Sequence, residues 1–290
     1  MFSQAERVIY RHPQLAEVIC QLRFPTILSI SAHEPAEFQE AIRDVFPQYL
    51  RRQDQPPVKI TPVPGQPPKV EQPKPVTNYQ FMTTDGSYRI NLTQDFISLT
   101  CAKYDRWEAF ARMMDKPLAS FIRTYHPAYF QRVGLRYLNA FSRRDLDLEG
   151  TPWRELMEPQ YLGLLAEEDM QEGAFVRCTQ DVDAAIPGGC RVKLHVGPGL
   201  IKRGGDNSDK EVKMIFDLDV SMSGNVPVNM AAASMQTVHT QAGSIFRDAI
   251  TDTLHDAMEP ERVWGAAASG FIVGAACMAA GDAVRFAEIL

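Results

Sequence analysis

The sequence predicts an α+β fold in which an antiparallel sheet of about eight strands carries two long helices on one face. Short segments of alternating apolar and polar residues supply the strands, and two long apolar stripes of helical period supply the helices. The third observation is an internal echo. When Leu22 is placed over Leu135, the segments EVICQLRFP (17–25) and FQRVGLRYLNAF (130–141) share a leucine, an arginine and an aromatic residue in register. The echo predicts a duplicated half with the order strand, helical excursion, three strands, long helix.

The predicted organisation is one domain followed by a short extension. The domain spans residues 1–260 and consists of two pseudo-repeats, at about 10–127 and 128–260. A proline-rich loop at 47–76 interrupts the first repeat, and residues 261–290 are expected to form an apolar C-terminal helical extension.

The composition limits the classes of protein to consider. The chain has 290 residues, 45% of them hydrophobic and 23% charged, as in ordinary globular proteins. Its net charge of −6 argues against a general binder of nucleic-acid backbones, because such proteins carry a basic excess. The five cysteines are odd in number and include no CxxC pair, so we expect reduced core thiols and no cofactor or metal. The opening MFSQAERVIYRHPQL lacks the apolar region of a secretory signal, and both observations favour a cytoplasmic protein.

The first repeat opens with a strand at 15–28, where Val18, Cys20 and Leu22 alternate with polar residues. An apolar stripe then predicts a short helix at 36–50. Prolines crowd the following residues, to Pro75, and neither a helix nor a central strand can persist there. We therefore expect an extended, solvated loop.

A meander and a long helix complete the first repeat. Its strands are predicted at 79–83, 88–93 and 96–101. The pair Asp85-Gly86 signals a tight turn between the first two, because both positions tolerate positive φ. A stripe at three- and four-residue steps then predicts a helix at 105–125, which Pro117 should kink.

The second repeat has the same order. The strand FQRVGLRYLNAF comes first, and a polar, partly helical excursion follows it. Three further strands are predicted at 175–182, 191–196 and 212–221, and Pro187-Gly188-Gly189 signals the turn between the first two. A final long helix is predicted at 228–258.

Charged residues of these strands form the first candidate site. Arg132 and Arg136 alternate with the apolar residues of their strand, and Arg23 holds the equivalent place in the first repeat. Asp217 and Asp219 share one face of the last strand. Cross-strand pairing of arginine with aspartate is the favoured interpretation, and an anion or metal site is the alternative.

Among the histidines, His239 lies beside the apolar stripe of the last helix and is placed to reach the sheet. A buried histidine that satisfies a backbone carbonyl is the favoured interpretation, with general acid–base chemistry as the alternative. We add His239 to the candidate ligand or partner face. The sequence contains no GxSxG, P-loop, dinucleotide-binding, HExxH or zinc-ligand pattern, so no residue is assigned a catalytic role.

The run VWGAAASGFIVGAACMAAG (263–281) carries no charge. Gly270 and Gly274 have the spacing of closely packed helices, and Trp264 and Phe271 add large apolar side chains. The run is barely long enough to span a bilayer and is dominated by alanine and glycine. A helix that packs on the domain or on a partner is the favoured interpretation, and a membrane span is the alternative.

Five segments form an ordered set, namely HPQLAEVICQLRF, DGSYRINLTQDFISLTCAKYDRWEAF, RVGLRYLNAF, FDLDV and VHTQAGSIFRDAIT. In this order and spacing they resemble the TIGR04255 family of sporadically distributed bacterial proteins, over about 10–257. The resemblance implies a bacterial or phage-related source and an accessory or mobile gene. It transfers no catalytic residue, because that family has no established activity. This chain departs from the family pattern at Gln14, in the proline-rich insert and after Pro260.

Together these observations predict a non-enzymatic protein-interaction or scaffold component of a bacterial defence or mobile-element system. Its partner would be another protein or a second copy of the chain. One alternative is a small-ligand sensor or metal-dependent enzyme with its site on the sheet face. The other is a membrane-active effector that uses the C-terminal segment.

Overall fold

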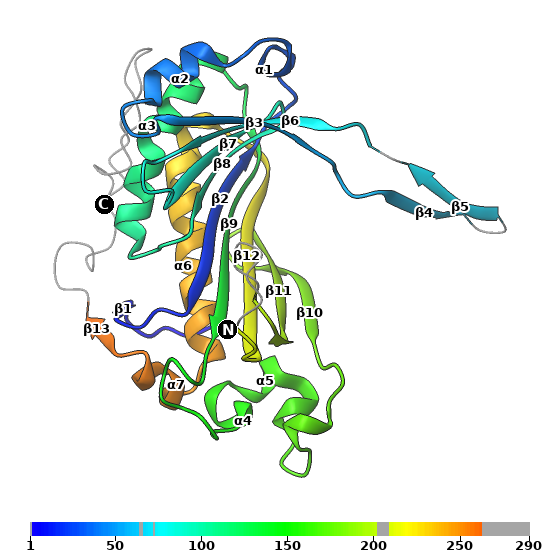
Figure 1. Ribbon diagram of the computed structural model, residues 1–290, viewed down its shortest axis with the longest axis vertical. Helices are drawn as coiled ribbons and strands as arrows, with labels where there is room; N and C mark the ends of the chain where they lie inside the picture. Colours follow the sequence, from blue (N-terminus) through cyan, green and yellow to red (C-terminus); the bar gives the residue numbers. More distant parts are fainter. Residues whose placement is uncertain (1, 64–65, 72, 202–208, 263–290) are drawn as a thin grey trace.

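The computed structural model describes residues 2–63, 66–71, 73–201 and 209–262 (Figure 1). The fold is α+β and is built on one nine-stranded antiparallel sheet. From edge to edge the strands are β10 (Gln180–Ile186), β11 (Cys190–Gly199), β12 (Lys213–Val226), β9 (Phe130–Phe141), β2 (Leu15–Arg23), β8 (Phe96–Cys101), β7 (Tyr88–Leu92), β6 (Val76–Met82) and β3 (Gln48–Asp54).

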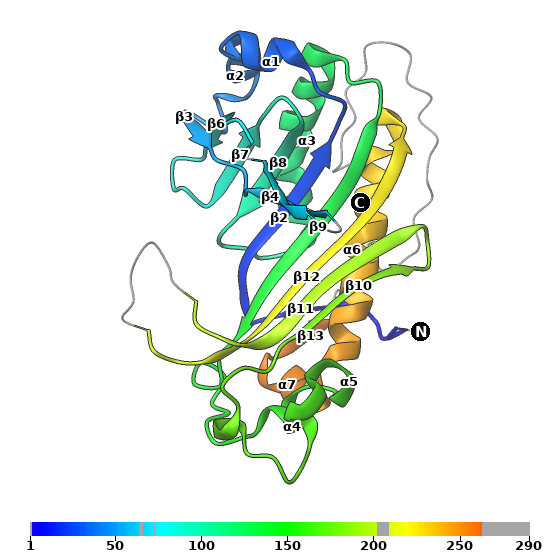
Figure 2. The same ribbon diagram turned by 90° about the vertical axis from the view of Figure 1, so that its right-hand side faces the viewer.

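Two long helices lie side by side on one face of this sheet (Figure 1). Helix α3 (Trp107–Tyr125) packs on β8, and α6 (Ala231–Ala249) packs on β9 and β12. Short helices close the two ends of the layer: α1 (Leu28–Ala32) and α2 (Ala36–Ile42) at one end, α4 (Trp153–Leu156), α5 (Pro159–Leu162) and α7 (Asp252–Ala257) at the other. None of the described helices covers the opposite face, which we call the open face (Figure 2). The core therefore lies between the sheet and the two long helices.

The strand order is consistent with the predicted duplication. In the first half β2 pairs with β8 of the meander β6-β7-β8, and in the second half β9 pairs with β12 of the meander β10-β11-β12. Strands β2 and β9 are antiparallel neighbours at the centre. With Leu22 placed over Leu135, Gln21 corresponds to Gly134, and these two residues are direct partners in the ladder. This strand order and register are what a pseudo-twofold axis through this pair would produce.

The proline-rich stretch at 47–76 differs from the predicted solvated loop. Its first residues, QYLRRQD, contain no proline and form the edge strand β3, so the sheet has nine strands instead of about eight. The chain then leaves the sheet as a two-stranded arm made of β4 (Lys59–Val63) and β5 (Gln66–Glu71). The arm projects on the side away from the long helices (Figure 1).

The predicted final helix at 228–258 is interrupted. It consists of the 3₁₀ turn η3 (Val228–Met230), α6 and α7, and the extended residue Ile250 separates the two α-helices. Ile250 forms a bridge with Met157, and the amide of Glu158 donates to the carbonyl of Ala249 at 3.0 Å. The tertiary partner therefore ends α6, because it offers the backbone a β-type pairing in place of the next helical turn.

Other boundaries also differ. The strand predicted at 15–28 ends at Arg23, and the strand predicted at 212–221 continues to Val226. The helix predicted at 36–50 ends at Ile42, since β3 begins directly after Pro47. The strand predicted at 175–182 lies at Gln180–Ile186, because it runs up to the Pro187-Gly188-Gly189 turn, where both glycines have positive φ. The excursion before it contains the 3₁₀ turns η1 (Gly163–Ala166) and η2 (Glu172–Ala174).

The chain ends of the described part meet. Strand β1 (Val8–Tyr10) pairs antiparallel with β13 (Pro260–Arg262), where a helical extension was expected to begin. The rest of the predicted extension, with Trp264, Gly270, Phe271 and Gly274, lies outside the described residues. The four described cysteines are free thiols, three of them buried, as predicted.

A candidate site on the open face of the sheet

The predicted arginines and aspartates lie together on the open face. Arg136 forms a bidentate pair with Asp217, in which Nε donates to Oδ1 at 2.6 Å. Arg132 donates to Asp219 at 2.5 Å. The hydrogen bonds of Asp217 raise the pKa of Arg136, so its charge is fixed at neutral pH. Cross-strand pairing, the favoured interpretation, is therefore the arrangement that forms.

Each arginine pairs diagonally with an aspartate that is not its direct neighbour in the ladder. Asp219 is the direct neighbour of Arg136, whereas Ser223 is that of Arg132. Arg132 therefore extends along the sheet over Gly134 to reach Asp219. A Cβ atom at Gly134 would lie 2.2 Å from the Arg132 guanidinium, so only glycine leaves room for this path. Arg23 lies directly opposite Arg132, and the diagonal pairing draws one of these two like charges away from the other.

A row of alternating charge crosses the second half of the open face. Asp183 on β10, Lys193 on β11, Asp219 on β12 and Arg136 on β9 are successive neighbours in the ladders. We call these four residues the charged row. Beside the row, a surface depression of about 340 Å³ is also lined by Asp217. Its walls offer both donors and acceptors of opposite charge within a small area, which suits a polar, mixed-charge partner.

Short polar side chains form the floor of the first half. They are Asn78, Gln80, Asn91, Ser98 and Thr100, which we call the amide ladder, and all five are buried. Gln80 Nε2 donates to Asn91 Oδ1 at 3.0 Å, and Asn91 Nδ2 donates to Ser98 Oγ at 3.2 Å. Asn78 Oδ1 has no hydrogen-bond partner within the described part of the chain. These mutual bonds satisfy most of the buried polar groups and fix the side chains in place.

His239 is not part of this face, contrary to its predicted grouping with the arginines. It projects from α6 toward the helix-covered side of the sheet, where its Nδ1 pairs with the hydroxyl of Tyr137 at 2.8 Å. Its ring stacks on Trp107 of α3 at 4.3 Å. Burial and the nearby Arg7 cation lower the pKa of His239 to about 3, so the ring is neutral at physiological pH. The hydrogen-bond partner of His239 is therefore a tyrosine hydroxyl, and not the backbone carbonyl that the sequence predicted.

Sequence reasoning missed the amide ladder and the outer half of the charged row. The signal for the ladder is present, because Asn78, Gln80 and Asn91 alternate with buried apolar residues in their strands. Asp183 and Lys193 also alternate with apolar neighbours, but their meeting with Asp219 depends on the pairing register, which the sequence does not specify.

Comparison of the chain with known protein families and with curated proteins finds no match. Among the residues that the structure describes, no group of three or more His, Cys, Asp or Glu side chains is arranged to hold a metal ion. None of the helices described is long and apolar enough to cross a membrane.

Proposed function

We propose that this protein is a non-enzymatic interaction module whose open sheet face binds another protein. The observation that carries the proposal is the one-sided layer: helices cover one face of the sheet, and the other face presents the charged row. Preformed polar groups of both signs provide orientation and specificity for a partner of complementary charge.

The β4–β5 arm supports this proposal. It stands off from the edge strand β3 on the same side as the open face (Figure 1). A partner seated on the sheet could contact the arm as well, and contacts at two places on one partner would multiply the affinity. A second copy of the chain is the alternative protein partner. The resemblance to an accessory bacterial family adds the proposal that the partner belongs to a defence or mobile-element system, which the neighbouring genes would test.

A charge-reversal comparison tests the face directly. Arg52 and Lys193 are exposed on the open face and form only long ion pairs, so Arg52→Glu with Lys193→Glu should leave the fold intact. The matched control is Arg43→Glu with Arg106→Glu, which makes the same change of charge at similarly exposed positions away from the open face. Affinity-tagged wild-type and variant proteins, expressed in source cells, would be analysed by quantitative mass spectrometry.

The expected result is a stoichiometric partner that remains with wild type and control and falls at least about tenfold with the open-face variant. Native mass spectrometry distinguishes a different protein from a second copy by the mass of the complex. Equal recovery of every partner on all three proteins would contradict the proposal.

The depression beside the charged row supports a second candidate, a small-ligand sensor. Arg136, Asp217 and Asp219 offer the donors and acceptors that a small zwitterion requires. A ligand in this depression would raise the unfolding midpoint of the wild-type protein with no partner protein present. Thermal shift with a panel of amino acids and nucleotides therefore separates the two candidates.

A further inference from the structure

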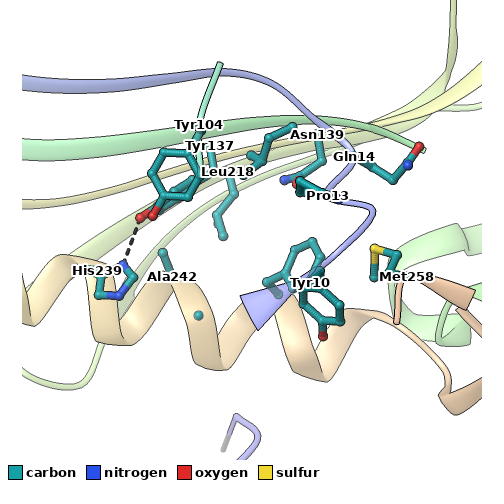
Figure 3. A pocket seen from close by; sticks show the side chains of 13 residues that line it. Tyr10, Pro13, Gln14, Tyr104, Tyr137, Asn139, Leu218, His239, Ala242 and Met258 are labelled. Atoms are coloured by element: carbon teal, nitrogen blue, oxygen red, sulfur yellow. Dashed lines mark hydrogen bonds between the residues drawn. The ribbon is translucent and has the colours of Figure 1, made fainter. Parts of the chain in front are cut away.

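A small cavity lies on the opposite side of the sheet, between its core face and α6 (Figure 3). Its volume is about 130 Å³. Segments from both ends of the described chain border it, because Tyr10 is the last residue of β1 and Met258 is the C-cap of α7. The cavity shares no lining residue with the open-face depression, so it is a separate site.

Most of the cavity wall is apolar. Leu218 contributes from the sheet, Ala242 and Phe246 contribute from α6, and Tyr10 lies over the helix with its ring edge-on to Phe246 at 5.9 Å. Ala242 is buried and points from α6 toward the sheet (Figure 3). An apolar space of similar volume accepts a single benzene ring.

One end of the cavity is polar and uncharged. The hydroxyls of Tyr104 and Tyr137 lie together above His239 (Figure 3), and Tyr137 bonds to the His239 ring. Burial raises the pKa of both tyrosines and lowers that of His239, so all three groups are neutral at pH 7. Two cations act on lining residues, and both are already paired: Arg7, near His239, with Glu108, and Arg247, near Tyr10, with Asp252. An anion in the cavity would therefore lose its hydration with no charged partner in return.

Gly243 borders the cavity at its solvent-exposed rim. It lies in the middle of α6, its φ is not positive, and a Cβ atom would meet nothing within 4 Å. Glycine at such a position costs about 1 kcal/mol relative to alanine. The space beside Gly243 is open to solvent, so a methyl group at this position would be tolerated.

We propose that this cavity binds a small neutral aromatic molecule that carries one hydroxyl group. The ring would lie between Phe246, Tyr10 and Leu218, and the hydroxyl would exchange hydrogen bonds with the tyrosine–histidine end. The ligand class follows from the volume, the aromatic walls and the neutral tyrosine–histidine end. The other polar lining residues, Asn139 and Gln14, are bonded to the backbone of Phe216 and Ser142.

Titration of the full chain with phenol, benzene and benzoate tests this assignment by calorimetry and thermal shift. Each probe is titrated to about 10 mM, because a ligand of this size is expected to bind with a Kd near 1 mM. Phenol should bind at one site per chain and raise the unfolding midpoint, benzene should bind about three- to tenfold more weakly, and benzoate should leave the midpoint unchanged. Absence of phenol binding, or benzoate binding as tight as that of phenol, would overturn the proposal.

Three variants locate the site. Ala242→Leu places three more carbons in the cavity and should abolish phenol binding, whereas Gly243→Ala adds one carbon in open space and should preserve it. Tyr137→Phe removes the polar partner, so phenol affinity should fall about three- to tenfold while benzene affinity stays the same. If Ala242→Leu fails to fold, Tyr137→Phe decides alone. Unchanged phenol binding in both Tyr137→Phe and a folded Ala242→Leu protein would place the ligand elsewhere.

Discussion

At the scale of single residues, Gly134 determines which ion pairs the open face forms. Its missing side chain lets Arg132 cross the strand to Asp219, so Gly134→Ala should displace the guanidinium and uncouple this pair. Arg132→Met should then lower the free energy of unfolding by about 0.2–1 kcal/mol in the wild-type background and by almost nothing in the Gly134→Ala background. Urea unfolding of the four proteins in this double-mutant cycle measures the difference.

Arg136→Met provides the control for the cycle, because the pair of Arg136 with Asp217 does not cross Gly134. Its cost should be equal in both backgrounds. If Gly134→Ala instead leaves the cost of Arg132→Met unchanged, Arg132 reaches Asp219 by a path that does not need the glycine.

The sequence indicated which charged residues would share a face, because the period of two in a strand places Arg132 with Arg136 and Asp217 with Asp219. It did not indicate the diagonal pairing, since that depends on the Cβ-free surface of Gly134 and on the register between β9 and β12. His239 was wrongly grouped with the arginines and aspartates for a related reason. The sequence of a helix shows which of its sides is apolar, but it does not show on which face of the sheet that side packs.

At the scale of secondary structure, Thr251 marks the break between α6 and α7. Its hydroxyl accepts from the amide of Leu254 at 3.4 Å as the N-cap of α7, and it donates to the carbonyl of Glu155 at 2.8 Å. Thr251→Ala removes both bonds and should lower the free energy of unfolding by about 1–2 kcal/mol. Thr251→Ser retains the hydroxyl and should recover most of this loss in the same urea titration. Equal destabilisation by both variants would assign the effect to the methyl group.

Elements that depend on local sequence were predicted well. Helix α3, with its long regular stripe, and strand β8 lie within two residues of their predicted bounds. Elements whose ends depend on partners distant in the sequence were predicted poorly. Strand β3 needed β6 as its neighbour, and the end of α6 needed the bridge between Met157 and Ile250. The Thr251-Asp252 cap signal is present in the sequence, but the continuing apolar stripe masked it.

At the scale of the whole molecule, the duplicated order of elements was visible in the sequence because the two central strands kept a shared Leu-Arg-aromatic pattern. Gln21 and Gly134, which correspond in the sequence echo, are direct partners in the ladder between those strands. The cavity behind the sheet could not be predicted, because it is made where α6, the core face and the N-terminal segment meet. Side chains at sequence positions as distant as Tyr10, Tyr137 and Phe246 define it together.

His239 connects the two long helices to the sheet and should make global stability depend on pH. Its ring stacks on Trp107 and bonds to Tyr137, and the charged groups Arg7 and Glu108 lie near it. The pKa is about 3 in the folded state and 6.5 in the unfolded chain, so below pH 6.5 only the unfolded chain takes up the proton. Stability is therefore fully present above pH 6.5 and declines as the pH falls toward 3.

Between about pH 7 and 5, where carboxylates scarcely titrate, the wild-type protein should lose up to about 2 kcal/mol through this residue. His239→Gln retains a hydrogen-bonding side chain but no titration, so it should be less stable than wild type at pH 7 and lose less stability on acidification. His255, whose pKa burial also lowers, is present in both proteins, and its contribution cancels in the comparison. Urea midpoints measured at several pH values give the two curves. Parallel curves would mean that folded His239 accepts a proton near its ordinary pKa, and the junction of helices and sheet would then be open to water.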